Sequence, residues 1–124
     1  MADRPIRTFR DLIAWQRGKA LTRIVYQHTQ AMPASEQFGL TSQMRRAACS
    51  IPLNIAEGYG LGSTEQFPRH PRYARVSIME LDTALEIAAE VCALAVPSQL
   101  LDILAETDRV VQGLIRSLEN GRDQ

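Results

Sequence analysis

The chain has 124 residues, of which 45% are hydrophobic and 23% are charged, the composition of one globular domain rather than of a disordered or fibrous protein. Basic and acidic residues number 14 each, so the formal net charge is zero. This balance argues against strong nucleic-acid binding, which usually goes with an excess of basic residues.

The two cysteines, Cys49 and Cys92, stand alone in the sequence. Two isolated thiols do not form a disulfide framework, so we interpret them as reduced, buried side chains of a cytoplasmic protein. The charged first residues, MADRPIRTFRD, have no apolar stretch and do not predict a signal peptide. No apolar run approaches the roughly 18 residues of a membrane-spanning helix, so no membrane association is expected.

The first predicted helix spans residues 9–31. Thr8 is its expected N-cap, with Asp11 at the third position of a capping box, and Met32-Pro33 ends the helix. The residues expected to face the core are Phe9, Ile13, Ala20, Leu21, Ile24 and Ala31.

The second predicted helix spans residues 36–59, with its start open between Ser35 and Thr41. Pro52 lies inside this helix and removes a hydrogen bond to the carbonyl of Ala48, which predicts a kink. Two helices separated at Pro52 are the alternative, but the apolar stripe keeps its phase across the proline and favours one helix. That stripe consists of Met44, Ala47, Ala48, Ile51, Ile55 and Tyr59.

A third helix is predicted at residues 71–95, with Pro71 in its first turn, and a fourth at residues 98–120, ending at Asn120-Gly121. Because the connections are short, neighbouring helices should be antiparallel. The predicted fold is therefore all-α, an antiparallel up-down-up-down four-helix bundle that forms a single domain over residues 1–124. The expected core residues are Ala74, Ile78, Leu81, Leu85, Ala89 and Cys92 on the third helix, and Leu100, Ile103, Leu104, Val110, Val111, Leu114, Ile115 and Leu118 on the fourth.

Three of the predicted helices carry apolar residues outside their core stripes, although a bundle helix usually buries about three positions in seven. In a monomer these side chains would form exposed patches, which usually mark interfaces. An irregular bundle that buries them at its centre is the alternative. We favour a homo-oligomer, with an interface that includes Trp15, Tyr26, Leu53, Val76, Ile87, Val91 and Leu94.

Residues 38–60 read FGLTSQMRRAACSIPLNIAEGYG. This stretch resembles the motif of the four-helix bundle proteins, also known as proteins encoded in intervening sequences of large-subunit ribosomal RNA genes. Residues 9–29 and 74–88 are similar to that family's first and third helices. The resemblance implies a ring-like homopentamer whose biochemical function is mostly unknown. The best understood relatives are accessory proteins of diversity-generating retroelements, which bind a reverse transcriptase and nucleic acid through basic surface.

Five arginines are candidates for contact with phosphate, because the planar guanidinium donates two hydrogen bonds at once. The alternative, favoured by the neutral net charge, is a solvated face whose arginines pair with neighbouring acids. The candidates are Arg45, Arg46, Arg69, Arg72 and Arg75.

Aromatic and basic residues also alternate on the first predicted helix, at Trp15, Lys19, Arg23 and Tyr26. This combination occurs both in surfaces that stack nucleic-acid bases and in subunit contacts. We favour the subunit contact.

No catalytic or metal-binding pattern stands out in the sequence. Asn54 and Glu57 belong to the motif of the second helix, and we assign them a structural role. His28 and His70 have no neighbours at metal-ligand spacing, so no metal or other cofactor is expected. We therefore expect a non-catalytic scaffold that binds itself and a protein partner, such as a reverse transcriptase. The alternative is a ring that binds RNA or DNA.

Overall fold

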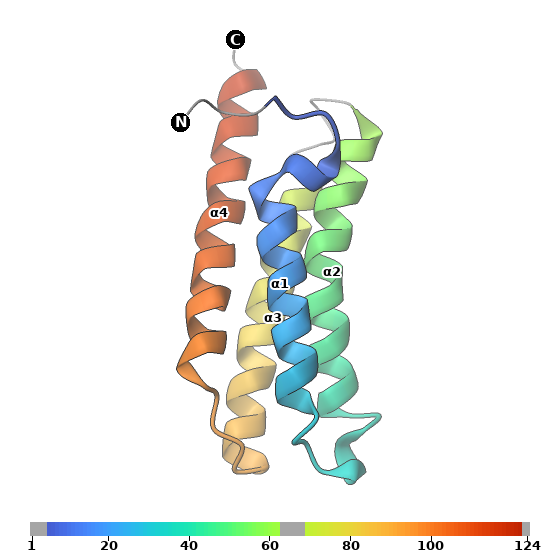
Figure 1. Cartoon of the computed structure of the whole chain (residues 1–124), viewed down its shortest axis with the longest axis vertical. Helices are drawn as coiled ribbons and strands as arrows, with labels where there is room; N and C mark the ends of the chain where they lie inside the picture. Colours follow the sequence, from blue (N-terminus) through green and yellow to red (C-terminus); the bar gives the residue numbers. More distant parts are fainter. Residues whose placement is uncertain (1–4, 63–68, 123–124) are drawn as a thin grey trace.

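The computed structural model describes residues 5–62 and 69–122, without the side chains of residues 121 and 122. Four helices make up this part of the chain: α1 (Ile13–Thr29), α2 (Leu40–Leu61), α3 (Arg69–Val91) and α4 (Ser98–Arg122). Figure 1 shows that each helix runs antiparallel to the next, so that α1 begins and α4 ends at the same end of the bundle. The predicted all-α up-down-up-down bundle is confirmed.

The helices follow one another around the core, since α2 packs on α1 and α3, and α4 packs on α3 and α1. The predicted stripes of α2 and α3 supply most of the core, including the completely buried Met44, Ile51, Ile55 and Leu81. Thr107 of α4 is also completely buried, although as a polar residue it was not among the predicted core residues.

α2 continues through Pro52 as one helix, which excludes the alternative of two separate helices. Proline has no N–H to donate, so the carbonyl of Ala48 loses its partner within the helix. The hydroxyl of Thr22, on α1, shares its one hydrogen between this carbonyl at 3.0 Å and the carbonyl of Gly18 at 2.8 Å. A side chain of the neighbouring helix therefore takes the place of the missing backbone donor.

Gly18 allows α1 and α2 to approach closely at the same level. A Cβ atom on Gly18 would lie 3.2 Å from both Ile51 Cγ2 and Pro52 Cδ, a tighter contact than packed side chains normally make. The packing of the first half of α1 therefore depends on the small residues Ala14 and Gly18, and Leu21 and Val25 follow them on the same buried face.

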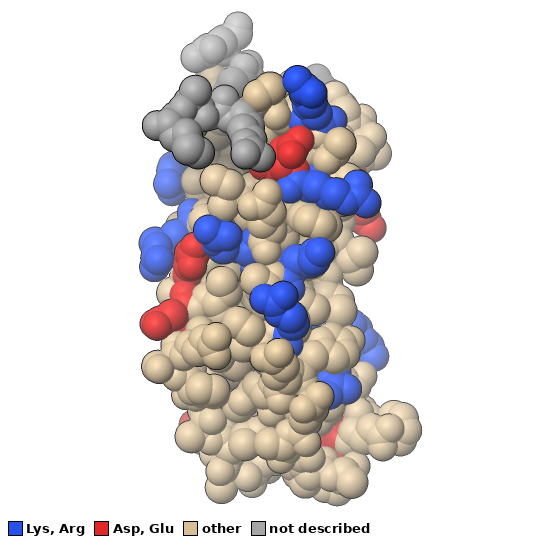
Figure 2. Space-filling view, in the orientation of Figure 1, with Lys and Arg blue, Asp and Glu red and all other residues tan. Residues whose placement is uncertain are grey.

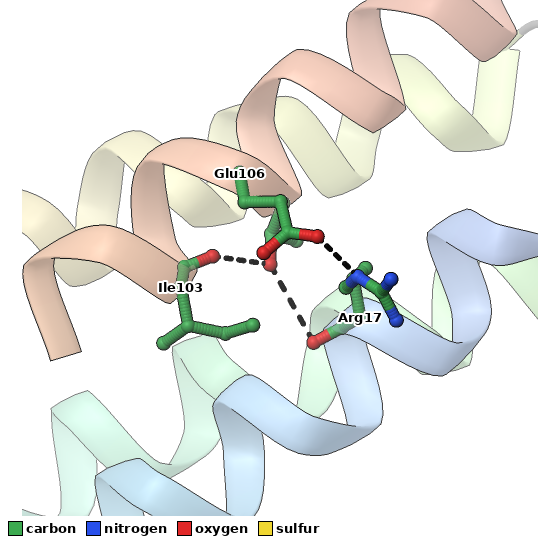
Figure 3. Close-up of polar contacts among 4 residues, drawn as sticks. Arg17, Ile103 and Glu106 are labelled. Carbon is green, nitrogen blue, oxygen red and sulfur yellow. Dashed lines mark hydrogen bonds and ion pairs between the residues drawn. The ribbon is translucent and has the colours of Figure 1, made fainter. Parts of the chain in front are cut away.

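Polar contacts join α4 to α1. Arg17 forms an ion pair with Glu106, as Figure 3 shows. The hydroxyl of the adjacent Thr107 donates to the carbonyl of Ile103 at 2.6 Å and lies 3.5 Å from the carbonyl of Arg17.

The prediction of one helix over residues 9–31 was wrong at both ends. Phe9–Asp11 form a separate 3-10 turn, closed by the predicted capping box of Thr8 and Asp11, and Leu12 is extended before α1 begins. This interruption turns Ile13 away from the core, so that its side chain is 56% exposed although it was expected to be buried. The prediction gave weight to large apolar residues, whereas the first half of α1 is buried through the small residues Ala14 and Gly18.

The second predicted helix starts later than residue 36. Ala34–Glu36 form a 3-10 turn, and α2 begins at Leu40. The carboxylate of Glu36 accepts a hydrogen bond from the Leu40 N–H at 3.0 Å. A Cβ on the intervening Gly39 would lie 2.5 Å from this carboxylate, so the glycine leaves room for the acidic cap. At the other end, Gly62 ends α2 with φ +67°.

The predicted limits of the last two helices also need correction. Within the described residues α3 begins at Arg69 rather than at Pro71, and it ends at Val91 rather than at residue 95. Ala93 adopts the left-handed conformation (φ +53°), which cannot continue an α-helix. α4 runs through Asn120 to Arg122 instead of ending at the expected cap. None of the described helices is long and apolar enough to cross a membrane.

Candidate interaction surfaces

One candidate surface covers the groove between α1 and α2. The ammonium of Lys19 lies 4.9 Å from the ring centre of Trp15, and the guanidinium of Arg45 lies 4.6 Å from that of Tyr26. Leu53, one turn after Cys49 on the same side of α2, is 58% exposed. We call this surface the basic face and define it by Trp15, Lys19, Arg23, Tyr26, Arg45, Arg46 and Leu53.

The charge of this surface follows from the sequence of its helices. α1 contains no acidic residue, and α2 contains none before Glu57. Figure 2 shows Lys and Arg side chains gathered over the middle and upper part of the side on which α1 lies, with few acidic side chains among them.

Tyr26 and Cys49 join the two helices within the basic face. The Tyr26 hydroxyl lies 3.7 Å from Cys49 Sγ, within hydrogen-bonding distance for sulfur. This hydrogen bond, together with the electrostatic interaction with Cys49 and partial burial, raises the pKa of Tyr26, while Arg45 acts in the opposite direction. Arg45 thus contacts the face of the Tyr26 ring in a cation–π arrangement, while Cys49 contacts its hydroxyl.

A second candidate surface lies on the outer side of α3. Val76, Met79 and Ile87 are exposed there and, with Leu40 and Gln43 of α2, line a shallow groove. Val91, at the end of the helix, is 68% exposed. The second half of α3, from Glu80 to Val91, carries only acidic charges. We call this surface the acidic face and define it by Val76, Met79, Glu80, Glu86, Ile87, Glu90 and Val91.

The five candidate arginines do not share one surface. Arg45 points toward α1, where its Nε donates to Thr29 Oγ1 at 2.8 Å. Arg72 and Arg75 point toward α4 and form ion pairs there, Arg72 with Glu119 and Arg75, at 3.6 Å, with Asp108.

Arg46 and Arg69, the remaining two candidates, are exposed and form no ion pair within the described part of the chain. The five side chains therefore face different neighbours, and the structure does not bring them together as one patch. The ion pairs of Arg72 and Arg75 could not be assigned from the sequence, because their partners lie far along the chain, on the neighbouring helix α4.

The residues predicted to form an oligomer interface fall into two groups. Trp15, Tyr26 and Leu53 belong to the basic face, whereas Val76, Ile87 and Val91 belong to the acidic face. All of them are exposed except Trp15, which is half-buried beneath Lys19 and packs edge-on against Phe9.

Leu94 was assigned to the third helix by the sequence, and this assignment was wrong. It is half-buried in the non-helical segment that follows Val91, because the left-handed Ala93 has already ended α3.

The polar residues of the α2 motif form a clasp with the start of α3. His70 Nδ1 lies 3.3 Å from Asn54 Oδ1 and 3.6 Å from Glu57 Oε2, and its ring packs edge-on against Tyr73. The Asn54 amide donates to the carbonyl of Ser50 at 2.8 Å. These contacts hold His70 in the first turn of α3, although the proline that follows it disfavours the helical conformation at this position. They fit the structural role expected for Asn54 and Glu57.

His28 differs from His70 in having no hydrogen-bond partner for its buried Nε2 atom among the described residues. Burial lowers the pKa of His28, because the charged form is poorly solvated there. Within the described part of the chain, no three His, Cys, Asp or Glu side chains gather in a way that could hold a metal ion.

Comparison with protein families matches residues 10–116 to the family described as "23S rRNA-intervening sequence protein". The chain belongs to this family. The match extends over all four helices and includes both the basic face and the acidic face of this 23S rRNA-intervening sequence protein. No curated protein matches the chain.

Proposed function

We propose that this member of the 23S rRNA-intervening sequence protein family is a non-catalytic, homo-oligomeric scaffold that binds a protein partner. The observation that supports this proposal is the exposure of large apolar side chains on two neighbouring sides of the bundle, at Leu53, Val76, Ile87 and Val91. Such side chains are costly to leave in water, at about 25 cal/mol for each Å² of apolar surface, and contact with another subunit removes that cost.

The number of subunits is proposed from the family resemblance, which implies a pentamer. A protein of the retroelement type, such as a reverse transcriptase, is the proposed partner, and the cytoplasm is the proposed location. The absence of a nucleophile–base pair or a metal-binding motif from the sequence supports a role without catalysis.

Light scattering on a size-exclusion column tests the proposal directly. We expect a particle of about five times the mass of one 13.9 kDa chain, unchanged over a tenfold dilution. Leu53→Glu should reduce this mass, because it places a charge in the proposed contact. Leu101→Glu is the matched control, since Leu101 is 47% exposed on α4, outside both faces. A monomeric wild-type protein would refute the proposal.

A nucleic-acid-binding ring is the second candidate, and the basic face favours it. Aromatic rings overlaid by cations, as at Trp15 with Lys19 and Tyr26 with Arg45, are also found where proteins stack single-stranded bases. The test is a titration with short RNA and DNA at low salt, repeated as the salt is raised. Binding through phosphate must weaken steeply with salt, and absence of binding at low salt ends this candidate.

A further inference from the structure

We propose that the acidic face of one copy docks on the basic face of the next copy, so that the subunits associate head to tail. This inference rests on the proposed homo-oligomer and adds which two surfaces meet. It follows from the distribution of charge and apolar surface over the bundle.

The charges of the two faces are of opposite sign, and they form no ion pair within the described part of one chain. The second half of α3, from Glu80 to Val91, contains four exposed acidic side chains and no basic one. None of these four acids forms an ion pair in the described part of the chain, and neither do Lys19 and Arg23 of the basic face. Unpaired charges of opposite sign on two faces of one chain are the pattern expected where these faces meet in an assembly.

The charged side chains also have similar spacing on the two helices. Lys19 and Arg23 are one helical turn apart on α1, as are Glu86 and Glu90 on α3. Two helices that lie side by side can therefore bring two cations opposite two carboxylates. Between the charges, each face offers apolar side chains, Leu53 and Tyr26 on one and Ile87 and Val91 on the other. Charged positions would fix the alignment, and apolar contact would supply most of the affinity.

The position of the faces favours a closed assembly. The basic face lies between α1 and α2, and the groove of the acidic face lies between α2 and α3. These sides share α2 and are neighbours on the bundle, about a quarter turn apart in an arrangement of this kind. Repeated contact between surfaces at such an angle turns back on itself and closes into a small ring, whereas contact between opposite sides extends into a filament.

The two faces differ in charge, which disfavours a contact of either face with its own copy. A two-fold symmetric dimer centred on one face alone would oppose like charges, which would repel. Docking of one face on the other avoids this repulsion.

Charge reversal on each face tests the docking. One variant combines Glu86→Lys with Glu90→Lys, and the other combines Lys19→Glu with Arg23→Glu. Each variant alone should raise the dissociation constant of the assembly at least about tenfold in 0.1 M salt, because attraction becomes repulsion on one side of each contact. A chain that carries all four substitutions should assemble again, because every contact then joins opposite charges whatever the number of subunits.

The control is a variant with Asp102→Lys and Arg109→Glu, which reverses two exposed charges on α4 outside both faces. It should retain the mass of the wild-type assembly in light scattering. The circular dichroism spectrum of each variant should match that of the wild type, since all the changed side chains are exposed.

The outcomes separate this inference from the proposed function. A monomeric wild-type protein would overturn both. A wild-type oligomer that both reversals leave intact would overturn only the docking. The same holds if the reversals dissociate the assembly and the chain with all four substitutions does not assemble again. If Lys19→Glu with Arg23→Glu abolishes binding to RNA and leaves the oligomer unchanged, the basic face is a nucleic-acid surface and the docking is wrong.

Discussion

Replacing Thr22 by valine removes the hydroxyl that serves the carbonyl of Ala48 and keeps almost the same shape of side chain. Ala48 is completely buried, and Pro52 cannot donate to its carbonyl, so the variant leaves a buried acceptor without a partner. An unsatisfied buried group of this kind costs about 1–3 kcal/mol. Thr22→Val should therefore lower the free energy of unfolding by that amount.

The same change should have little effect in a Pro52→Ala background. Alanine at position 52 restores the backbone N–H, which can donate to the carbonyl of Ala48 within α2. Pro52→Ala alone also changes helix propensity and packing against Gly18, so only the coupling between the two positions is informative. We expect a coupling of about 1–2 kcal/mol in a double-mutant cycle.

The cycle can be measured by urea unfolding of the four proteins at one fixed concentration, followed by circular dichroism at 222 nm, a wavelength standard for helices. Equal losses for Thr22→Val in both backgrounds would refute the assignment of Thr22 as the replacement donor. A loss confined to the Pro52 background would confirm it.

Three further changes test other parts of the fold. Gly18→Ala should destabilise the protein, because crowding against Ile51 and Pro52 outweighs a helix-propensity gain of about 1 kcal/mol. Gly113→Ala should stabilise it, because a Cβ there meets only an Arg116 guanidinium atom at 3.8 Å. Equal gains in the free energy of unfolding, measured in urea, would contradict the close packing at Gly18. Ala93→Gly should raise the free energy of unfolding by about 0.5–1 kcal/mol, because glycine adopts the left-handed conformation without strain, and an unchanged melting temperature would count against this. Because burial lowers the pKa of His28, its contribution to the free energy of unfolding should be fully present above pH 6.5 and fall as the pH drops toward the folded-state pKa. His28→Gln should show less of this decline between pH 8 and pH 5. Identical pH profiles of the two proteins would disprove the assignment.

The parts of the fold that could be predicted are those in which large apolar residues carry the packing. The stripes of α2 and α3 were predicted because Met44, Ile51, Ile78 and Leu81 repeat with the helical period and are buried. The phase of α1 was missed because Ala14 and Gly18 bury little surface of their own and act by permitting close approach. The role of these small residues is apparent only when the position of the neighbouring helix α2 is known.

Contacts between side chains on different helices were also not predictable from the sequence. The pairing of Arg75 with Asp108 depends on how far α3 and α4 are shifted along each other, which no local pattern specifies. The end of α3 was not predicted because Ala93 adopts a left-handed backbone conformation that glycine or asparagine usually occupies at the end of a helix. The exposed apolar faces were foreseen because they depend only on the period of one helix at a time.

The separation of charge between the two faces changes what the zero net charge means for an approaching molecule. Net charge is a sum over the whole surface, but a partner in physiological salt responds to charges within about 8 Å, which is less than the width of the bundle. The charges of a single chain are therefore unevenly distributed despite their neutral sum, because α1 carries no acidic residue and the second half of α3 carries no basic one. The solubility of the protein should consequently rise with added salt, because salt weakens the attraction between oppositely charged surfaces of neighbouring molecules, rather than stay constant as for a neutral surface of evenly mixed charges.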